Sequence, residues 1–336
     1  MKNFSGVCQA AGADKPLRAF FIWITNIVTL NMRKIFCYSL FIIFLFSVTS
    51  CGLFDNQDTH PGYVRHCIRI MDRHGLYADT PEWKARKKEF LAAADTVSSL
   101  GWANYLIYQA LQVAGGKHSG LVAPVRDTVK YPEFAPEVRM LEGSIAYVKL
   151  PGHSGAQVSD SLYAYSVLHF LQEHSSVAGV VIDLRDNYGG NMYPMISAVS
   201  PLLPDGVILR FEGKKRTTPV MLGFVLRYVG IKASEIRKFP EGTPVAILTN
   251  DMTASSGEAT LLCFRGLDNT RSFGGPTAGF ASANRPFPLK NGYSLVLTTS
   301  RDVARTGEVF CDDPIAPDVE TETPLEDAIS WIQSTK

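Results

Sequence analysis

The sequence has no excess of charge of either sign. Its 336 residues contain 33 lysines and arginines against 32 aspartates and glutamates, which gives a formal net charge of +1. Proteins that bind nucleic acid or strongly acidic partners usually carry a clear imbalance. We therefore expect no nucleic-acid partner. Internal repeats, low-complexity tracts and runs of like charge are also absent, and the 46% hydrophobic content is that of an ordinary globular chain.

The chain after residue 51 is poor in cysteine. Six cysteines are present in total, but three of them lie at or before residue 51. The remaining Cys67, Cys263 and Cys311 have neither the density of a disulfide framework nor the spacing of zinc ligands. One bridge is possible in an exported protein, and the sequence does not choose it. We expect no metal and no other cofactor.

An apolar run long enough to cross a bilayer comfortably is also missing near the N-terminus. Residues 32–51 read MRKIFCYSLFIIFLFSVTSC, in which two basic residues precede a short apolar stretch and small residues precede Cys51. This pattern resembles a bacterial lipoprotein signal, which implies that Cys51 is lipidated and becomes the mature N-terminus. A plain signal peptide or a short anchor helix is the alternative. Met32 is the expected start of the natural chain.

Apolar periodicity predicts the elements of the remaining chain. Residues 62 to about 113 carry apolar residues at helical spacing. From residue 140 onward, apolar runs such as VVIDL and PVAILT alternate with amphipathic stretches, which predicts an α/β core. Residues 205–240 are interpreted as one strand followed by a loop and helix. In an α/β core, chemistry is expected where strands end and helices begin.

Three glycine-bearing polar turns follow apolar segments. They are GGKHSG around His118, DLRDNYGGN with Gly189 and Gly190, and NDMTASSGE with Ser255 and Ser256. A serine nucleophile needs an adjacent base, and glycine amides can approach an oxyanion closely. The three turns can therefore supply a nucleophile, a base and an oxyanion hole. Each turn also has a purely structural interpretation, as a helix cap or a tight turn.

Five motifs follow one another in the order found in C-terminal processing serine peptidases. They are VVIDLRDNYGGN, AILTNDMTASSGEA, GGPTAG, F-x-L-x-NGYSLVLT and PIAPDV. Together they cover roughly residues 140 to 325 and resemble the tail-specific protease and tricorn-core family. The resemblance implies an α/β, ClpP/crotonase-like catalytic core. We divide the chain into a signal and lipobox segment (1–51), a tether (52–61), an N-terminal helical subdomain (62–125) and a tail-specific protease-type catalytic domain (140–336).

Within this family the sequence resembles the tricorn-like branch, which uses a serine and a histidine. The match of SSGE to that branch's nucleophile motif implies that Ser255 is the nucleophile. The match of GKHSGL implies that His118 is the base. The resemblance also implies an oxyanion hole made of the Ser256 amide and one amide from Gly189 or Gly190.

The acid that would orient the histidine is expected near GEVFCDDPIAPD, close to the C-terminus. We expect Asp312 in this role, with Glu308 as the second choice. Glu258 is expected to be structural and to accept hydrogen bonds from local backbone amides. Asp183 and Asp186 are expected to hold the Gly-Gly turn in shape.

The sequence departs from the processing-protease branch in two places. Phe280 stands where that branch has the lysine of its Ser-Lys dyad, and the next lysine, Lys290, lies in a predicted hairpin. Only about 25 residues separate His118 from Ser144, which is too few for the PDZ domain that many family members carry. We therefore expect neither a Ser-Lys dyad nor substrate capture by a PDZ domain.

These observations predict a serine endopeptidase of the bacterial cell envelope that acts on peptides or proteins. Because glycine and not aspartate follows Cys51, we expect an outer-membrane lipoprotein, held at the membrane by its lipid. A catalytically inactive peptide- or ligand-binding lipoprotein on the same fold is the alternative, and an acyl-CoA enzyme of the crotonase type is a more distant one. With His118 as a neutral base of ordinary pKa, activity is expected to rise with pH near about 6.5.

The lipoprotein interpretation predicts that membrane attachment depends on Cys51. Changing Cys51→Ala removes the only group that can carry the lipid, so the protein should leave the membrane fraction. The measurement is membrane fractionation after a high-salt wash, with Cys67→Ala as the matched control. Unchanged fractionation of the Cys51→Ala protein would contradict the interpretation.

Overall fold

The computed structural model describes residues 57–124, 134–155 and 158–335. Contacts group the chain from Gln57 onward into one unit. The predicted signal segment and Cys51 lie outside the described residues, as does the first half of the predicted tether, residues 52–56. Within the described ranges, no helix combines the length and the apolar character needed to span a membrane.

Three helices open the described chain. They are α2 (His60–His74), α3 (Pro81–Ala94) and α4 (Leu100–Gly115). Each begins at a serine or threonine whose hydroxyl accepts a hydrogen bond from a backbone N–H of the first turn, which satisfies a donor that the helix itself cannot. Their apolar faces form a core that includes three leucines of the β9–β10 hairpin: Leu289, Leu295 and Leu297.

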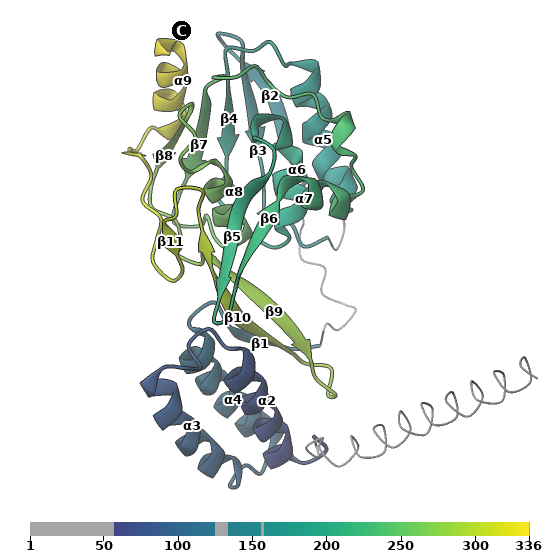
Figure 1. The fold of residues 1–336 in the computed structure, drawn as a ribbon, viewed down its shortest axis with the longest axis vertical. Coiled ribbons are helices and arrows are strands. Elements are labelled where there is room, and N and C mark those ends of the chain that lie inside the picture. The colour runs from purple at the N-terminus through teal and green to yellow at the C-terminus, as the bar shows by residue number, and fades with distance from the viewer. Residues whose placement is uncertain (1–56, 125–133, 156–157, 336) are drawn as a thin grey trace, which may run out of the picture. The chain divides into compact units, whose positions relative to one another are not determined.

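A six-stranded sheet forms the centre of the remaining chain (Figure 1). Its strand order is β12-β8-β7-β4-β3-β2, and every neighbouring pair is parallel except β2 with β3. The strands are β2 (Glu137–Leu141), β3 (Ile145–Lys149), β4 (Gly179–Asp183), β7 (Val245–Thr249), β8 (Thr270–Gly274) and β12 (Val319–Glu320). Because β4 and β7 are parallel neighbours, the turns that follow them meet at one edge of the sheet.

Helices cover both faces of this sheet, so its strands are apolar on both sides. In β3, Ala146 and Val148 belong to one core and Ile145 and Tyr147 to the other. The first face packs against α5 (Asp160–Glu173), α6 (Met192–Ala198), α7 (Leu222–Val229) and α8 (Ser256–Phe264). The second face packs against α9 (Pro324–Ser334).

A second sheet is built around the long strand β10 (Ser294–Val303). Its main path is β1-β10-β5-β6, and β9 and β11 also pair with β10. The other strands are β1 (Gly120–Val122), β5 (Val207–Gly213), β6 (Thr217–Met221), β9 (Ser282–Pro288) and β11 (Val309–Phe310). Through β1 and β9, this sheet links the end of α4 to the part of the chain that contains the parallel sheet.

The predicted α/β class and the helical N-terminal region are confirmed. The interpretation of residues 205–240 was incomplete, because a second strand, β6, follows β5 as a hairpin partner. Pro219 lies within β6, and proline argues against a strand unless the strand is at an edge. β6 is the end of the β1-β10-β5-β6 path, so the proline is tolerated there.

The packing of α4 on β10 predicts a substitution that loosens the helical region. Leu297 is fully buried, and a side chain added at Gly115 would meet it at 2.8 Å. Leu297→Ala should lower the free energy of unfolding by about 2–5 kcal/mol, as cavity-forming changes do. Urea denaturation measures this loss.

Leu171→Ala is the matched control, because Leu171 is equally buried but belongs to the core of the parallel sheet. Both variants should be destabilised, and only Leu297→Ala should also slow the reaction of Ser255 with a phosphonate probe, since α4 leads into His118. A loss below about 1 kcal/mol for Leu297→Ala would show that the helices dock without this contact.

Candidate active site

Ser255 lies in the turn between β7 and α8, in an unusual backbone conformation. Its φ of 52° and ψ of −113° belong to a region that residues with a side chain rarely adopt. Holding a residue there costs on the order of 1–3 kcal/mol. The turn is fixed by its neighbours: the Ala254 N–H donates to the Asn187 carbonyl at 2.8 Å, and the Thr253 hydroxyl donates to the Leu184 carbonyl at 2.8 Å.

Glu258 holds this strained turn from inside the protein. Its carboxyl group is fully buried and accepts the backbone N–H of Ser255 at 2.8 Å, of Gly279 at 2.9 Å and of Phe280 at 2.7 Å. The Thr277 hydroxyl donates a fourth hydrogen bond. Burial raises the pKa of Glu258 above its usual range, although these donors act in the opposite direction. The predicted structural role of Glu258 agrees with these contacts.

The Gly-Gly turn after β4 packs directly against Ser255. Gly189 and Gly190 have φ values of 97° and 115°, which only glycine adopts readily. A side chain at Gly189 would meet the Ser255 Cβ at 2.7 Å, and one at Gly190 would meet the His153 carbonyl oxygen at 2.0 Å. Both positions therefore require glycine, and the turn fits only because both are present.

The backbone N–H of Gly189 is hydrogen-bonded, whereas the N–H of Gly190 has no acceptor among the described residues. The Gly189 N–H donates to the Asn187 side-chain oxygen at 2.9 Å, so it is not available to an oxyanion. The Gly189 carbonyl accepts the His153 N–H at 2.9 Å, which turns the Gly190 N–H of the same peptide to the opposite side. Neither the Gly190 N–H nor the Ser256 N–H has an acceptor among the described residues. The candidate donors are therefore Gly190 and Ser256.

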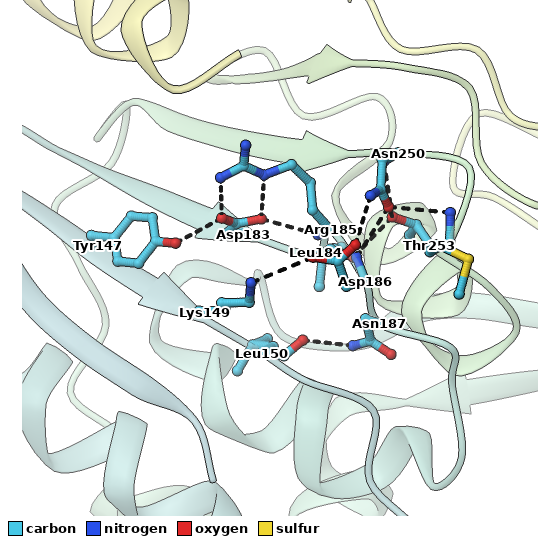
Figure 2. Close-up of polar contacts among 11 residues, drawn as sticks. Tyr147, Lys149, Leu150, Asp183, Leu184, Arg185, Asp186, Asn187, Asn250 and Thr253 are labelled. Atoms are coloured by element: carbon cyan, nitrogen blue, oxygen red, sulfur yellow. Dashed lines mark hydrogen bonds and ion pairs between the residues drawn. The ribbon is translucent and has the colours of Figure 1, made fainter. Parts of the chain in front are cut away.

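Figure 2 shows the polar network beneath the two turns. The Asp183 carboxylate accepts the Tyr147 hydroxyl at 2.7 Å and is paired with the Arg185 guanidinium at 2.6 Å. Asp186 and Asn250 exchange two hydrogen bonds, at 2.9 and 3.0 Å, across the ends of β4 and β7. Both aspartates thus brace the strand ends. The direct contact with the Gly-Gly turn, which was expected from them, comes from Asn187 instead.

His118 lies in the turn that joins α4 to β1. Gly116 ends α4 with a φ of 77°. The His118 carbonyl accepts the Asn284 side-chain amide at 2.9 Å, and its ring Nδ1 is 2.8 Å from the Ser282 hydroxyl. The ring also lies edge-on to Phe280, with the ring centroids 5.2 Å apart. These contacts fix both the backbone and the ring plane.

The fold brings the predicted residues to one cavity of about 510 Å³. Its lining includes Ser255, His118, Gly190, Ser256 and Ser282. Tyr188, Met192, Tyr193 and Phe211 form apolar or aromatic walls, and the polar side chains of Asn191, Asn284 and Asp302 also line the cavity. No hydrogen bond joins Ser255 to the His118 ring among the described residues. Such contacts often tighten only when substrate is bound.

The structure does not place Asp312 against the histidine ring. One of its carboxylate oxygens accepts the Tyr77 hydroxyl at 2.7 Å, and the other is buried without a hydrogen-bond partner. The Nδ1 position, where a third catalytic residue would bind, is taken by Ser282. Asp312 lies close enough to influence His118 through its charge. Its orienting role is therefore not seen as a hydrogen bond and stays a prediction.

Glu308, which was the second choice for the acid, and the lysines Lys117 and Lys290 contact other groups and do not line the cavity. Glu308 forms an ion pair with Arg265 at 3.0 Å. The Lys117 ammonium lies 4.5 Å from the Phe280 ring centroid, and Lys290 is exposed beside Asp58. No described lysine lines the cavity.

Burial dominates the titration of His118. It lowers the pKa of the ring to about 4, with repulsion from Lys117 adding to the effect and the Asp312 charge partly offsetting it. The ordinary value near 6.5, on which the expected pH dependence relied, therefore does not apply to the folded protein. At neutral pH the ring is uncharged and can accept a proton.

The described residues offer no obvious metal site. No group of three or more His, Cys, Asp or Glu side chains within them is arranged to hold an ion. Cys67, Cys263 and Cys311 are all unpaired thiols.

Comparison with known proteins places this fold and site in a family. Residues 144–321, more than half of the chain, match peptidase family S41. A nisin-resistance protein from Lactococcus lactis is 33% identical over 279 residues, which are 81% of this chain and 86% of that protein. A carboxy-terminal-processing protease from Bartonella bacilliformis is 26% identical over 201 residues, 60% of this chain and 43% of that protein.

A solved structure is also similar to this chain. A lipoprotein from Streptococcus agalactiae has a TM-score of 0.75 and 31% sequence identity, and the match covers 83% of this chain and 97% of that one. The chain therefore belongs to peptidase family S41, and it is homologous to carboxy-terminal processing proteases. No PDZ domain is visible in its described residues.

Two residues of the site were not predicted. Asn187, which binds the Gly-Gly turn, precedes it by two positions, and an asparagine just before a glycine turn is a known turn signal. Ser282 carries no such signal, because its contact with His118 spans 164 positions of sequence.

The lowered pKa of His118 predicts an acid-shifted activity profile. Because the ring acts as a base only when unprotonated, the rate of Ser255 modification by a fluorophosphonate should stay flat from neutral pH downward and fall only as the pH approaches about 4. Labelling rates between about pH 4 and 8 measure this, with circular dichroism to show that the protein stays folded.

The free energy of unfolding should also depend on pH in the acidic range. The unfolded chain takes up a proton on this histidine below about 6.5 while the folded protein does not, so stability falls as the pH drops from about 6.5 toward 4. A labelling rate that is half-maximal near 6.5 would show that the ring is solvated and would contradict the profile.

Proposed function

We propose that this protein is a serine peptidase in which Ser255 is the nucleophile and His118 the general base. The observation that carries the proposal is the convergence of four groups on one cavity: the Ser255 side chain, the His118 ring and two N–H groups without acceptors, at Gly190 and Ser256. Membership of a peptidase family supports it.

We assign to His118 the tautomer in which the Nδ1–H donates to the Ser282 hydroxyl. Nε2 then carries the lone pair that can take the Ser255 proton. Ser282 thus does part of what a carboxylate does in other serine peptidases. Asp312 acts on the ring through its charge and does not bind it directly.

The reaction then follows the ordinary course of acyl transfer. His118 takes the hydroxyl proton while Ser255 attacks the scissile carbonyl, and the oxyanion accepts hydrogen bonds from Gly190 and Ser256. Protonated His118 gives its proton to the leaving amine. Water then attacks the acyl-enzyme, with the same histidine as base, and releases the acid product. Each step uses only groups of this chain and water.

The substrate class is peptide or protein. The aromatic and apolar residues that line the cavity suit peptide side chains. The name of the relative from Lactococcus lactis suggests one concrete peptide, so nisin is the first substrate to test.

We further propose that the protein is a lipoprotein of the bacterial cell envelope, anchored through Cys51 and located at the outer membrane. The sequence pattern before Cys51 supports the lipid anchor, and so does the likeness to a solved lipoprotein from Streptococcus agalactiae. The outer-membrane location rests on the glycine that follows Cys51.

A fluorophosphonate probe tests the peptidase proposal. The wild type should be labelled on Ser255, and Ser255→Ala should abolish labelling. Ser256→Ala is the matched neighbour: it keeps its backbone N–H but loses the hydroxyl that donates to the Gly190 carbonyl at 2.6 Å, so labelling should slow only about tenfold, the effect of one hydrogen bond.

The alternative is a binding protein on the same fold. The absence of a carboxylate on the His118 ring is the observation in its favour. Failure to label the folded wild type, together with tight binding of intact nisin, would support the alternative and overturn the peptidase. Labelling together with nisin fragments in mass spectra would support the peptidase.

A further inference from the structure

One helix of the N-terminal region has an apolar surface that nothing in the described chain covers. α4 (Leu100–Gly115) contains no Asp, Glu, Lys or Arg, which is unusual for a helix at the protein surface. Its exposed residues are large and apolar or aromatic: Leu100 is 39% exposed, Trp102 48%, Tyr105 53% and Tyr108 48%. We call these four residues the α4 face.

The α4 face is separate from the side by which the helix packs. Ala103, Leu106, Ile107 and Ala110 are buried in the core shared with α2 and α3. The face lies on the other side, where the Trp102 and Tyr105 rings stack at 5.3 Å and 14°. The side chains of Asn104, Gln109 and Gln112 in α4 are polar but uncharged, and a helix face rich in large apolar and aromatic residues is normally buried. A second surface is therefore expected to cover this one.

The geometry of the helices relates the α4 face to the N-terminus of the chain. α2 and α4 run parallel, because the Tyr63 hydroxyl near the start of α2 donates to Asn104 near the start of α4 at 3.2 Å. At their other ends, a side chain at Gly75 would meet the Ala114 carbonyl at 2.6 Å. The chain therefore arrives from Cys51 at the same end of the helices that carries Leu100 and Trp102.

We propose that the α4 face docks on the interfacial zone of the lipid bilayer in which Cys51 is anchored. The proposal rests on lipidation of Cys51. Eight residues lie between Cys51 and His60, so the start of α2 can lie no more than about 32 Å from the anchor. Tryptophan and tyrosine are the residues enriched at this zone, since their rings are apolar and their N–H and O–H groups meet water and head groups.

Docking of this face would position the catalytic cavity. α4 is about 24 Å long, and its far end leads through Gly116 to His118. One rigid element thus connects the docked surface to the base of the active site. The cavity is held at a set distance from the bilayer, where peptides that gather at the membrane surface reach it.

Quenching of Trp102 fluorescence by brominated lipids tests the docking. Of the four tryptophans, Trp23 precedes the expected mature N-terminus and Trp83 is fully buried. Subtracting the emission of Trp102→Phe isolates Trp102. The lipidated protein is reconstituted in vesicles of phosphatidylethanolamine and phosphatidylglycerol, and lipids with brominated chains should quench most of the Trp102 emission. The remaining tryptophan emission should be quenched to the same extent in Trp102→Phe and in the Trp102→Phe, Tyr105→Glu double variant.

A second experiment tests the α4 face without the lipid on Cys51. The chain from Gly52, held on nickel-chelating vesicles by an N-terminal histidine tag, should show the same quenching without any lipid on Cys51. Quenching in this arm supports the α4 face even if Cys51 proves not to be acylated or Ser255 proves unreactive. Absence of quenching in this arm overturns the docking.

Two controls complete the test. Leu162→Glu changes an equally exposed apolar residue on α5 and should leave quenching unchanged. Tyr105→Glu should abolish the docking, while fluorophosphonate labelling of Ser255 in that variant reports that the fold is intact. A dimer in solution that Tyr105→Glu dissociates would show that the face binds a second copy of the chain, and would overturn the proposal.

Discussion

The buried carboxyl group of Glu258 is the contact on which the candidate site depends. It accepts backbone amides from the nucleophile turn at Ser255 and from the loop at Gly279 and Phe280. The strained backbone of Ser255 costs free energy, and hydrogen bonds of a buried acceptor offset it. Because Phe280 in turn packs against the His118 ring, the same group connects the nucleophile to the base. The geometry of the candidate site thus depends on a buried residue that does not line the cavity.

Around this contact, adjacent parallel strands supply most of the remaining site. β4 ends in the Gly-Gly turn and β7 ends in the Ser255 turn, and the Asn187 carbonyl joins the two through the Ala254 amide. His118 and Ser282 come from outside the parallel sheet, from the turn after α4 and from β9. The packing of α4 on β10 therefore affects where the His118 ring lies relative to Ser255, whose turn follows β7.

The sequence alone predicted the candidate residues that lie in short local motifs. Ser255, Gly189 and Gly190 lie in glycine turns directly after apolar strands, and His118 lies in a glycine turn after an apolar helix, so the α/β core and the candidate residues followed together. Ser282 could not be predicted in the same way, because its contact joins distant parts of the chain.

Distance along the chain also explains why the contact of Asp312 was not predicted. Its partner, the Tyr77 hydroxyl, is 235 positions away, in the loop after α2. The pKa of His118 also could not be predicted from the sequence, because burial in the folded protein lowers it and the adjacent residues do not determine that burial. Pattern predicts where a strand or turn occurs, whereas tertiary contacts decide which polar groups meet.

A crystal structure of the protein after reaction with a small fluorophosphonate tests the central claim most directly. The account predicts phosphorus bonded to Ser255 Oγ and a phosphoryl oxygen within hydrogen-bond distance of both the Gly190 and the Ser256 N–H, with the Glu258 contacts unchanged. A phosphoryl oxygen directed away from these two amides, or phosphorus on another residue, would contradict it.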